Sequence, residues 1–163
     1  MTPSPTGGPS EKKEFLQTLR SPREKLGGYV VLPRLIDKVR LRASGRLPPD
    51  YLANLLRRTD PAAGFYPLDG RFLEFSGLDP EELGRAILAS SDDEAVLNWV
   101  KCHARPLSSE EIADWCRSFE NSSPDDRRTT HRKKTYPELA HRPDIGTLSP
   151  FDLIDLDEGR PIS

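Results

Sequence analysis

Charged side chains that could bind an anion occur between positions 20 and 69. The candidate binding residues are Arg20, Arg23, Arg34, Asp37, Lys38 and Asp69. Arg34 and Lys38 are one helical turn apart, so a helix over this region places them on the same side. Guanidinium groups near a helix start can hold a phosphate or carboxylate with two hydrogen bonds, and the helix dipole adds to the attraction. The pattern predicts a non-enzymatic binding module for a small anionic ligand or an acidic peptide.

Two other interpretations of the same residues stay open. In the first, the cations form a structural ion-pair network with Asp69, Glu74, Asp79 or the aspartates of the C-terminal region. In the second, the protein is a small enzyme acting on a phosphorylated or carboxylated metabolite. Asp37 or Asp69 would then be the general base, and the arginines would hold the substrate.

Other kinds of chemistry lack their usual sequence patterns. The three histidines are scattered, and Cys102 and Cys116 form no CxxC pair, so we expect no metal. No phosphate-binding glycine loop and no G-x-S-x-G motif occurs, and we expect no cofactor. Nucleic acid is an unlikely partner: residues 11–46 carry ten Lys/Arg against four Asp/Glu, but residues 60–98 carry nine acidic side chains against two basic ones.

The elements that must position these residues are marked by helix-start signals. These are Ser21-Pro22, Pro33, Pro49, Asp79-Pro80, Ser91, Ser108, Ser123-Pro124 and Ser149-Pro150. The signal at Ser21 predicts a short helix that Gly27-Gly28 ends. Pro33 predicts a helix to Ser44, ended by Gly45. The helix from Pro49 should reach Leu56, and residues 59–70 read as a loop.

The fold class that follows is all-α, because no run of β-branched residues with period two occurs. We expect one compact domain of about six to seven short helices over residues 13–160, after a disordered tail at residues 1–12. No apolar run approaches the ~20 residues that span a membrane. The N-terminus has no signal-peptide pattern, and the cysteines read as reduced thiols, so we expect a cytoplasmic protein. Its oligomeric state has no sequence signal.

Five blocks of sequence resemble one bacterial family. They are LRSPREKLGGYVVLPRLIDKVRLRASGRLP (19–48), LDGRFLEFSGLD (68–79), SDDEAVLNWV (91–100), EEIADWC (110–116) and RPDIGTLSPFDLIDLDEGR (142–160). The family is DUF5069, which is known only as a domain of unknown function. The resemblance implies no activity, cofactor or partner. It does imply that charged positions such as Arg20, Arg34, Asp37 and Asp69 define the family, which favours a functional role for them.

Overall fold

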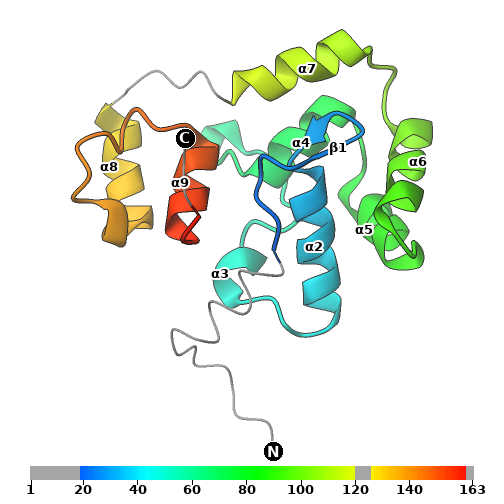
Figure 1. Ribbon diagram of the computed structural model, residues 1–163, viewed down its shortest axis with the longest axis horizontal. Coiled ribbons are helices and arrows are strands. Elements are labelled where there is room, and N and C mark those ends of the chain that lie inside the picture. The colour runs from blue at the N-terminus through cyan, green and yellow to red at the C-terminus, as the bar shows by residue number, and fades with distance from the viewer. Residues whose placement is uncertain (1–18, 120–125, 161–163) are drawn as a thin grey trace, which may run out of the picture.

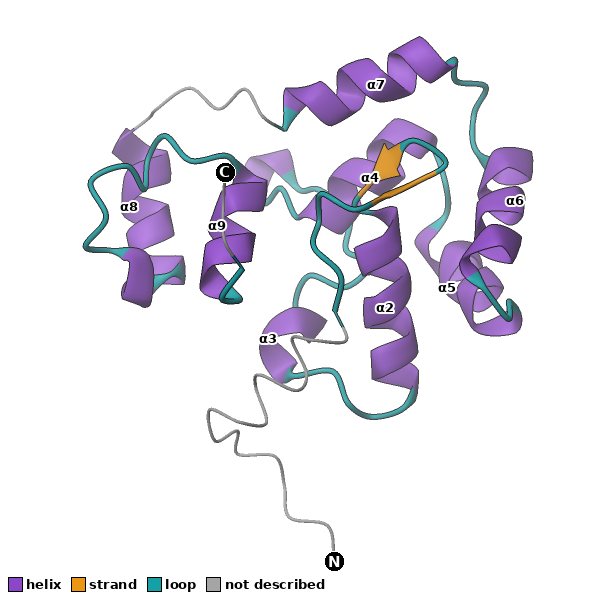
Figure 2. Ribbon diagram, viewed as in Figure 1, coloured by secondary structure: helices purple, strands orange, loops and turns teal. Residues whose placement is uncertain are grey.

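A computed structural model describes residues 19–119 and 126–160 of the chain, and its architecture is helical (Figures 1 and 2). The α-helices of these residues are α2 (Leu32–Ala43), α3 (Pro49–Leu52), α4 (Leu68–Ser76), α5 (Pro80–Ala89), α6 (Asp93–His103), α7 (Ser109–Ser118), α8 (Asp126–Thr135) and α9 (Pro150–Asp157). Short 3-10 turns, η1 (Pro61–Ala63) and η2 (Pro137–Leu139), complete them. The all-α expectation is confirmed. The tail expected at residues 1–12 lies outside the described residues.

A small antiparallel hairpin, β1 (Lys25–Leu26) with β2 (Tyr29–Val30), stands where a helix from Ser21 was predicted. That prediction was wrong. Gly27 and Gly28 have φ of 60° and 90°, so they form a two-residue loop whose twist suits paired strands. The amide of Arg23 donates to the Ser21 hydroxyl at 3.2 Å, so the expected cap closes a turn and starts no helix.

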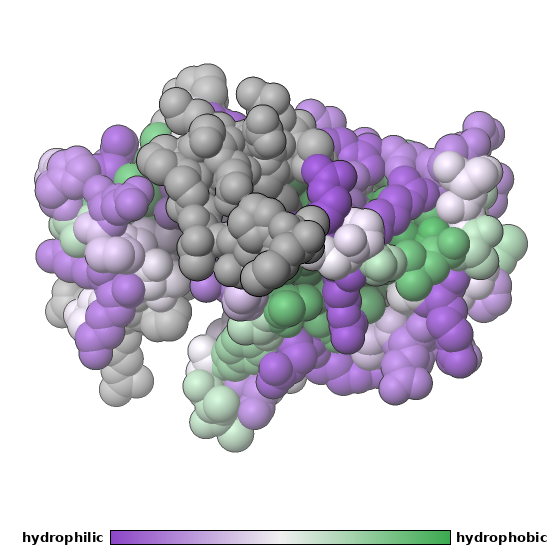
Figure 3. Space-filling model, turned by 90° about the horizontal axis from the view of Figure 1, so that it is seen from below, coloured by the Kyte–Doolittle hydropathy of each residue, from purple (hydrophilic) through white to green (hydrophobic). Residues whose placement is uncertain are grey.

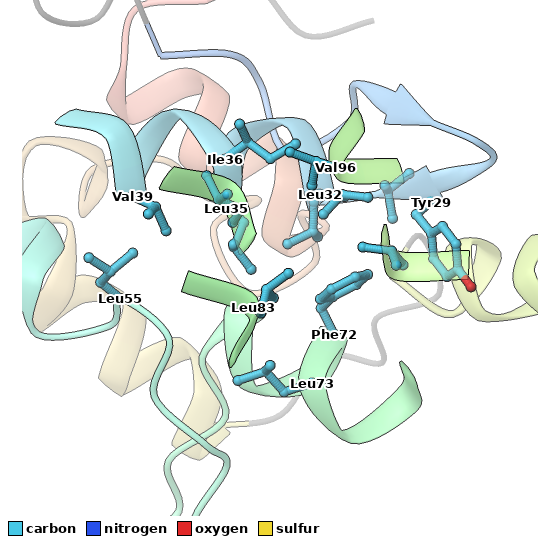
Figure 4. Close-up of a cluster of buried hydrophobic side chains, with 14 of the residues drawn as sticks. Tyr29, Leu32, Leu35, Ile36, Val39, Leu55, Phe72, Leu73, Leu83 and Val96 are labelled. Atoms are coloured by element: carbon cyan, nitrogen blue, oxygen red, sulfur yellow. The ribbon is translucent and has the colours of Figure 1, made fainter. Parts of the chain in front are cut away.

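Helix α2 forms the centre of the fold. The signals at Pro33 and Gly45 predicted a helix from Pro33 to Ser44, and the observed helix spans Leu32–Ala43. It ends where Gly45 adopts a φ of 74°, a conformation that favours glycine. Leu32, Leu35 and Ile36 on this helix are fully buried. Figure 4 shows these side chains directed toward buried residues of other elements, including Phe72.

Helices α4, α5 and α6 contribute apolar side chains to the core that α2 also forms. Phe72, Leu83, Ile87, Val96 and Val100 all have zero relative exposure. Burying a large apolar side chain stabilises a fold by about 1.5–3 kcal/mol, so this cluster is the main source of stability. Residues Arg71 to Phe75, for which the sequence left helix and extended chain open, belong to helix α4. The loop predicted for residues 59–70 ends earlier, because α4 begins at Leu68.

Three helix starts use the side-chain caps that the sequence suggests. The carboxylate of Asp79 and the hydroxyls of Ser108 and Ser149 each accept an amide hydrogen bond from the first turn of their helix. The cap of α6 is Asp92 instead of the predicted Ser91, because the Asp92 carboxylate accepts from the amide of Ala95 at 2.9 Å. The start predicted at Ser123-Pro124 lies outside the described residues.

The C-terminal helices α8 and α9 lie at the end of the molecule opposite α5 and α6 (Figure 1). They have a small apolar cluster of their own, made of Ile145, Leu148 and Leu153. Helix α9 is joined to the main core by Phe151, whose ring stacks on Phe119 with centroids 4.8 Å apart. Residues 150–160 therefore reach the central helix, and their carboxylates come close to its arginines.

Candidate functional site

The six candidate residues form ion pairs in several places and do not converge on one cavity. Arg34 and Lys38 leave α2 and are each 5% exposed, and Asp69 at the start of α4 is 1% exposed. Arg20 and Arg23 precede the hairpin and are partly buried. Each cation of the set contacts at least one carboxylate.

Arg34 is bound by Glu158, which follows the last turn of α9. Its guanidinium donates to both Glu158 oxygens, at 2.9 Å and 2.5 Å, and to the carbonyl of Arg20 at 3.1 Å. Arg160 and the Tyr51 hydroxyl also donate to the Glu158 carboxylate. Burial by itself would raise the pKa of Glu158, but the hydrogen bonds and charges of Arg34 and Arg160 lower it below its ordinary value. Burial and the neighbouring Glu158 raise the pKa of Tyr51.

Lys38 is bound by Asp69, so this pair joins α2 to α4. The Lys38 ammonium lies 2.7 Å from Asp69 Oδ1, and both side chains are buried. The second oxygen, Asp69 Oδ2, accepts from the amide of Leu56 at 2.9 Å. Both oxygens of this carboxylate are therefore engaged with neighbours inside the fold.

Arg20 is bound by Asp37 of α2 and by Asp93 at the start of α6. Its Nε lies 3.0 Å from Asp37 Oδ2, and its Nη1 lies 2.6 Å from Asp93 Oδ2. The hydrogen bond from Arg20 lowers the pKa of Asp93. Arg40 lies 3.7 Å from the same Asp93 carboxylate. This cluster links three segments that are distant in sequence.

Arg23 meets the C-terminal aspartates. Its guanidinium forms an ion pair with Asp152, lies 3.6 Å from Asp155 and donates to the Ser149 hydroxyl at 3.2 Å. The hydroxyl of Ser21 donates to Asp155 at 2.8 Å. Of the anionic partners considered from sequence, Asp69 and the C-terminal carboxylates are used.

Glu74 and Asp79, the other anionic partners considered, take part elsewhere. Glu74 accepts from the Thr59 hydroxyl, while Asp79 caps α5 and lies 3.7 Å from Arg58. Within the described residues, neither pairs with the six candidates. The arrangement of the candidates is that of a network that ties helices together.

A groove that the sequence did not suggest lies between α2, the turn after α3, and α5. Its volume is about 670 Å³. It is lined by Val39, Arg42, Ala43, Leu55, Leu56, Pro80, Glu81, Gly84, Arg85 and Leu88. Leu88 is 55% exposed and adds an apolar side chain to the edge of the groove. Hydrophobic side chains also reach the surface on the face of the molecule seen from below (Figure 3).

The arginines at this groove differ from those of the network. Arg42 and Arg85 are exposed, and within residues 19–119 and 126–160 neither side chain makes an ion pair, hydrogen bond or ring contact. Their sequence signal is weak, since an arginine on an amphipathic helix is ordinarily a solvated residue. Only the packing of α2 against α5 shows that both flank one apolar surface.

Smaller cavities also occur elsewhere in the described part of the chain. Smaller cavities of about 570 Å³ and 490 Å³ lie beside Ser21 and beside Trp99. Among the described residues, no group of three or more His, Cys, Asp or Glu side chains is placed to hold a metal ion. No helix in the described ranges is both long enough and apolar enough to cross a membrane.

The fold and the ion pairs define a small helical protein with an apolar core, in which a charge network links the central helix α2 to segments distant in sequence. The chain belongs to the family Domain of unknown function (DUF5069), which matches residues 16–160. The resemblance seen in the five sequence blocks is thereby confirmed. No curated protein shows significant similarity to the chain.

Proposed function

We propose that the protein is a non-enzymatic binding module whose groove between α2 and α5 takes an acidic, amphipathic helix of a partner protein. The observation that carries this proposal is the pair Arg42 and Arg85, which flank an apolar surface and have no ionic partner among the described residues. The groove takes the place of the Arg20–Asp69 group as the binding site.

An amphipathic helix fits the shape and chemistry of the groove. Val39, Leu55, Leu56 and Leu88 offer an apolar surface for side chains spaced three and four residues apart. Two guanidiniums above that surface favour carboxylates on the flanks of the helix. Glu81 is the single acidic lining residue, so it favours a partner helix with one basic residue near it.

In this proposal the charge network has a structural role and is not itself the binding site. An anionic ligand at Arg34 or Lys38 would have to displace a buried carboxylate, which would then lose its own partner. The enzymatic alternative requires a free carboxylate oxygen at Asp37 or Asp69. Asp37 accepts three hydrogen bonds from Arg20, and both Asp69 oxygens are engaged. The geometry therefore favours binding over catalysis.

The test uses three labelled helical peptides of about 15 residues, each with leucines at spacings of three and four. Their remaining positions are mainly Glu in the first, Gln in the second and Lys in the third. We expect the Glu peptide to bind tightest, with amide shifts in ¹⁵N NMR spectra centred on α2 and α5. Binding should weaken at high salt, because the groove arginines are exposed.

Variants locate the site. Arg42→Glu/Arg85→Glu and Leu88→Asp should each weaken the Glu peptide by about tenfold or more. Arg46→Glu is the matched control, because Arg46 is also exposed and without an ionic partner in the described chain but does not line the groove. The proposal is wrong if no peptide binds at millimolar concentration, or if Arg46→Glu has the same effect as the groove variants.

A further inference from the structure

The backbone at Leu56 has an unusual conformation where the chain forms one wall of the groove. Its φ is 54°, in the left-handed region that branched side chains rarely adopt. The helix predicted from Pro49 to Leu56 ends at Leu52. The positive φ at Leu56 then turns the chain away from the direction of that helix. Leu56 lines the groove and packs against the core. Something in the fold must hold this conformation.

Asp69 supplies the holding contact. Its Oδ2 accepts the Leu56 amide at 2.9 Å, although the two residues lie on different elements. Its Oδ1 is fixed by the Lys38 ammonium at 2.7 Å. Because Asp69 is 1% exposed and Lys38 is 5% exposed, water competes little with either contact. A backbone amide that loses its acceptor in a poorly solvated place costs about 1–3 kcal/mol, which is enough to influence a backbone conformation.

Two glycines leave room for the same segment. A Cβ at Gly70 would lie 2.6 Å from the carbonyl oxygen of Arg57 and 2.7 Å from the amide nitrogen of Thr59, so the chain passes directly over α4. A Cβ at Gly84 of α5 would lie 3.2 Å from Leu56 Cδ1. Leu56 is thus held from the α4 side by Asp69 and meets α5 on the other side.

We propose that Asp69 is a positioning residue for the groove: it sets the Leu56 wall, and Lys38 holds the Asp69 carboxylate in place. This inference rests on the proposed function for its binding consequence. It gives the buried pair a role that a general ion-pair network does not predict. Binding requires an acceptor oxygen at position 69, and the Lys38 charge is needed only because it compensates the buried Asp69 carboxylate.

Two matched double variants separate the acceptor from the charge. Lys38→Met/Asp69→Asn removes both charges but keeps an oxygen that can accept the Leu56 amide. Lys38→Met/Asp69→Leu removes the charges and the acceptor. We expect the Leu56 amide to stay protected from hydrogen exchange in the Asn variant and to exchange at least tenfold faster in the Leu variant. The Glu peptide should bind the Asn variant within about threefold of the unmodified protein, and the Leu variant at least tenfold more weakly.

Gly84→Ala is the second test, for the case that the Leu variant does not fold. Alanine favours the helix, and its methyl group must displace Leu56 by a few tenths of an ångström. We expect weaker binding of the Glu peptide with no loss in melting temperature.

The outcomes separate this inference from the proposed function. Equal peptide affinity in both double variants, or unchanged affinity in Gly84→Ala, overturns the positioning role while leaving the groove as a binding site. No binding of the Glu peptide to the unmodified protein overturns the proposed function and the binding role of Asp69 with it. Equal exchange of the Leu56 amide in both double variants overturns the holding contact whether or not any peptide binds.

Discussion

Replacing Glu158 by leucine should destabilise the protein more than any other single loss from the charge network. Leucine keeps much of the volume of the side chain but removes every acceptor. Among the described residues, the Arg34 guanidinium, 5% exposed, would keep the Arg20 carbonyl and the face of the Tyr51 ring as partners. The Tyr51 hydroxyl and Arg160 would also lose the acceptor that they share with Arg34.

The structure sets the size of this effect. Removing one member of a buried ion pair costs about 3–5 kcal/mol, because the remaining charge stays in a poorly solvated place. A domain of this size loses roughly 2–4 °C of melting temperature per kcal/mol, so we expect a drop of roughly 6–20 °C. The whole fold is worth only about 5–15 kcal/mol, so Glu158→Leu is close to unfolding at the upper end.

Removing Arg34 instead of Glu158 should lower the free energy of unfolding by less. After Arg34→Met, Glu158 still accepts from Arg160 and Tyr51, so its charge remains compensated. The double variant Arg34→Met/Glu158→Leu buries no unpaired charge at this position. We expect it to lie within about 2 kcal/mol of the unmodified protein. The three variants therefore form a double-mutant cycle with a favourable coupling energy.

Urea unfolding of the four proteins, followed by circular dichroism, gives the free energies of unfolding for the cycle. Thermal unfolding of the same proteins gives their melting temperatures. The reasoning is refuted if Glu158→Leu melts within about 2 °C of the unmodified protein, since the pair would then be solvated. It is also refuted if the double variant is no more stable than Glu158→Leu. Arg34→Glu, which places a second carboxylate against the buried Glu158, should not fold at 25 °C.

Three further predictions concern pH, backbone packing and capping. Because the folded pKa of Glu158 is lowered, its contribution to stability is present above the unfolded value of about 4.3 and lost as pH falls through the folded pKa. Urea titrations between about pH 3 and pH 7 should thus show a smaller acid loss in Glu158→Leu, and an equal loss would contradict the linkage. Gly70→Ala should lower stability by about 1–3 kcal/mol, because its Cβ would meet the Arg57 carbonyl; an unchanged melting temperature would mean that the segment is not packed on α4. Ser149→Ala should cost about 1 kcal/mol through loss of the cap to the Asp152 amide, with thermal unfolding as the measurement and no change as the contrary result.

Local signals predicted the helices well because the forces that start and end a helix act within a few residues. Asp79, Ser108 and Ser149 cap their helices as expected, and Gly45 ends α2. The same kind of signal failed at Ser21. There the Gly27-Gly28 loop closes a hairpin, and the hydroxyl of Ser21 contacts Asp155, which is 134 positions away.

The charged residues were identifiable from sequence, and Asp69 and the C-terminal aspartates could be considered as partners, but the individual pairs could not be predicted. Arg34 and Glu158 are 124 residues apart, and no spacing rule relates them. A convergent set of arginines has the same sequence pattern whether it meets a ligand or a distant carboxylate. The groove was harder still to predict, because it depends on how α2 packs on α5 and on the space that Gly84 leaves for Leu56.

The location of the sequence blocks changes what the charged signature means. The block at residues 19–48 supplies Arg20, Arg23 and Arg34, and the block at 142–160 supplies the carboxylates that bind the last two. The two blocks with the largest numbers of charged residues thus contribute opposite partners to one network, which explains these charges as requirements of the fold. The α5 wall of the groove, from Glu81 to Leu88, falls between the blocks at 68–79 and 91–100. If the proposed function is right, members of the family share the network and differ in this wall. Exchanging residues 81–88 between two members should then exchange their peptide preference and leave both folds intact, whereas a preference that stays with the rest of the chain would place recognition elsewhere.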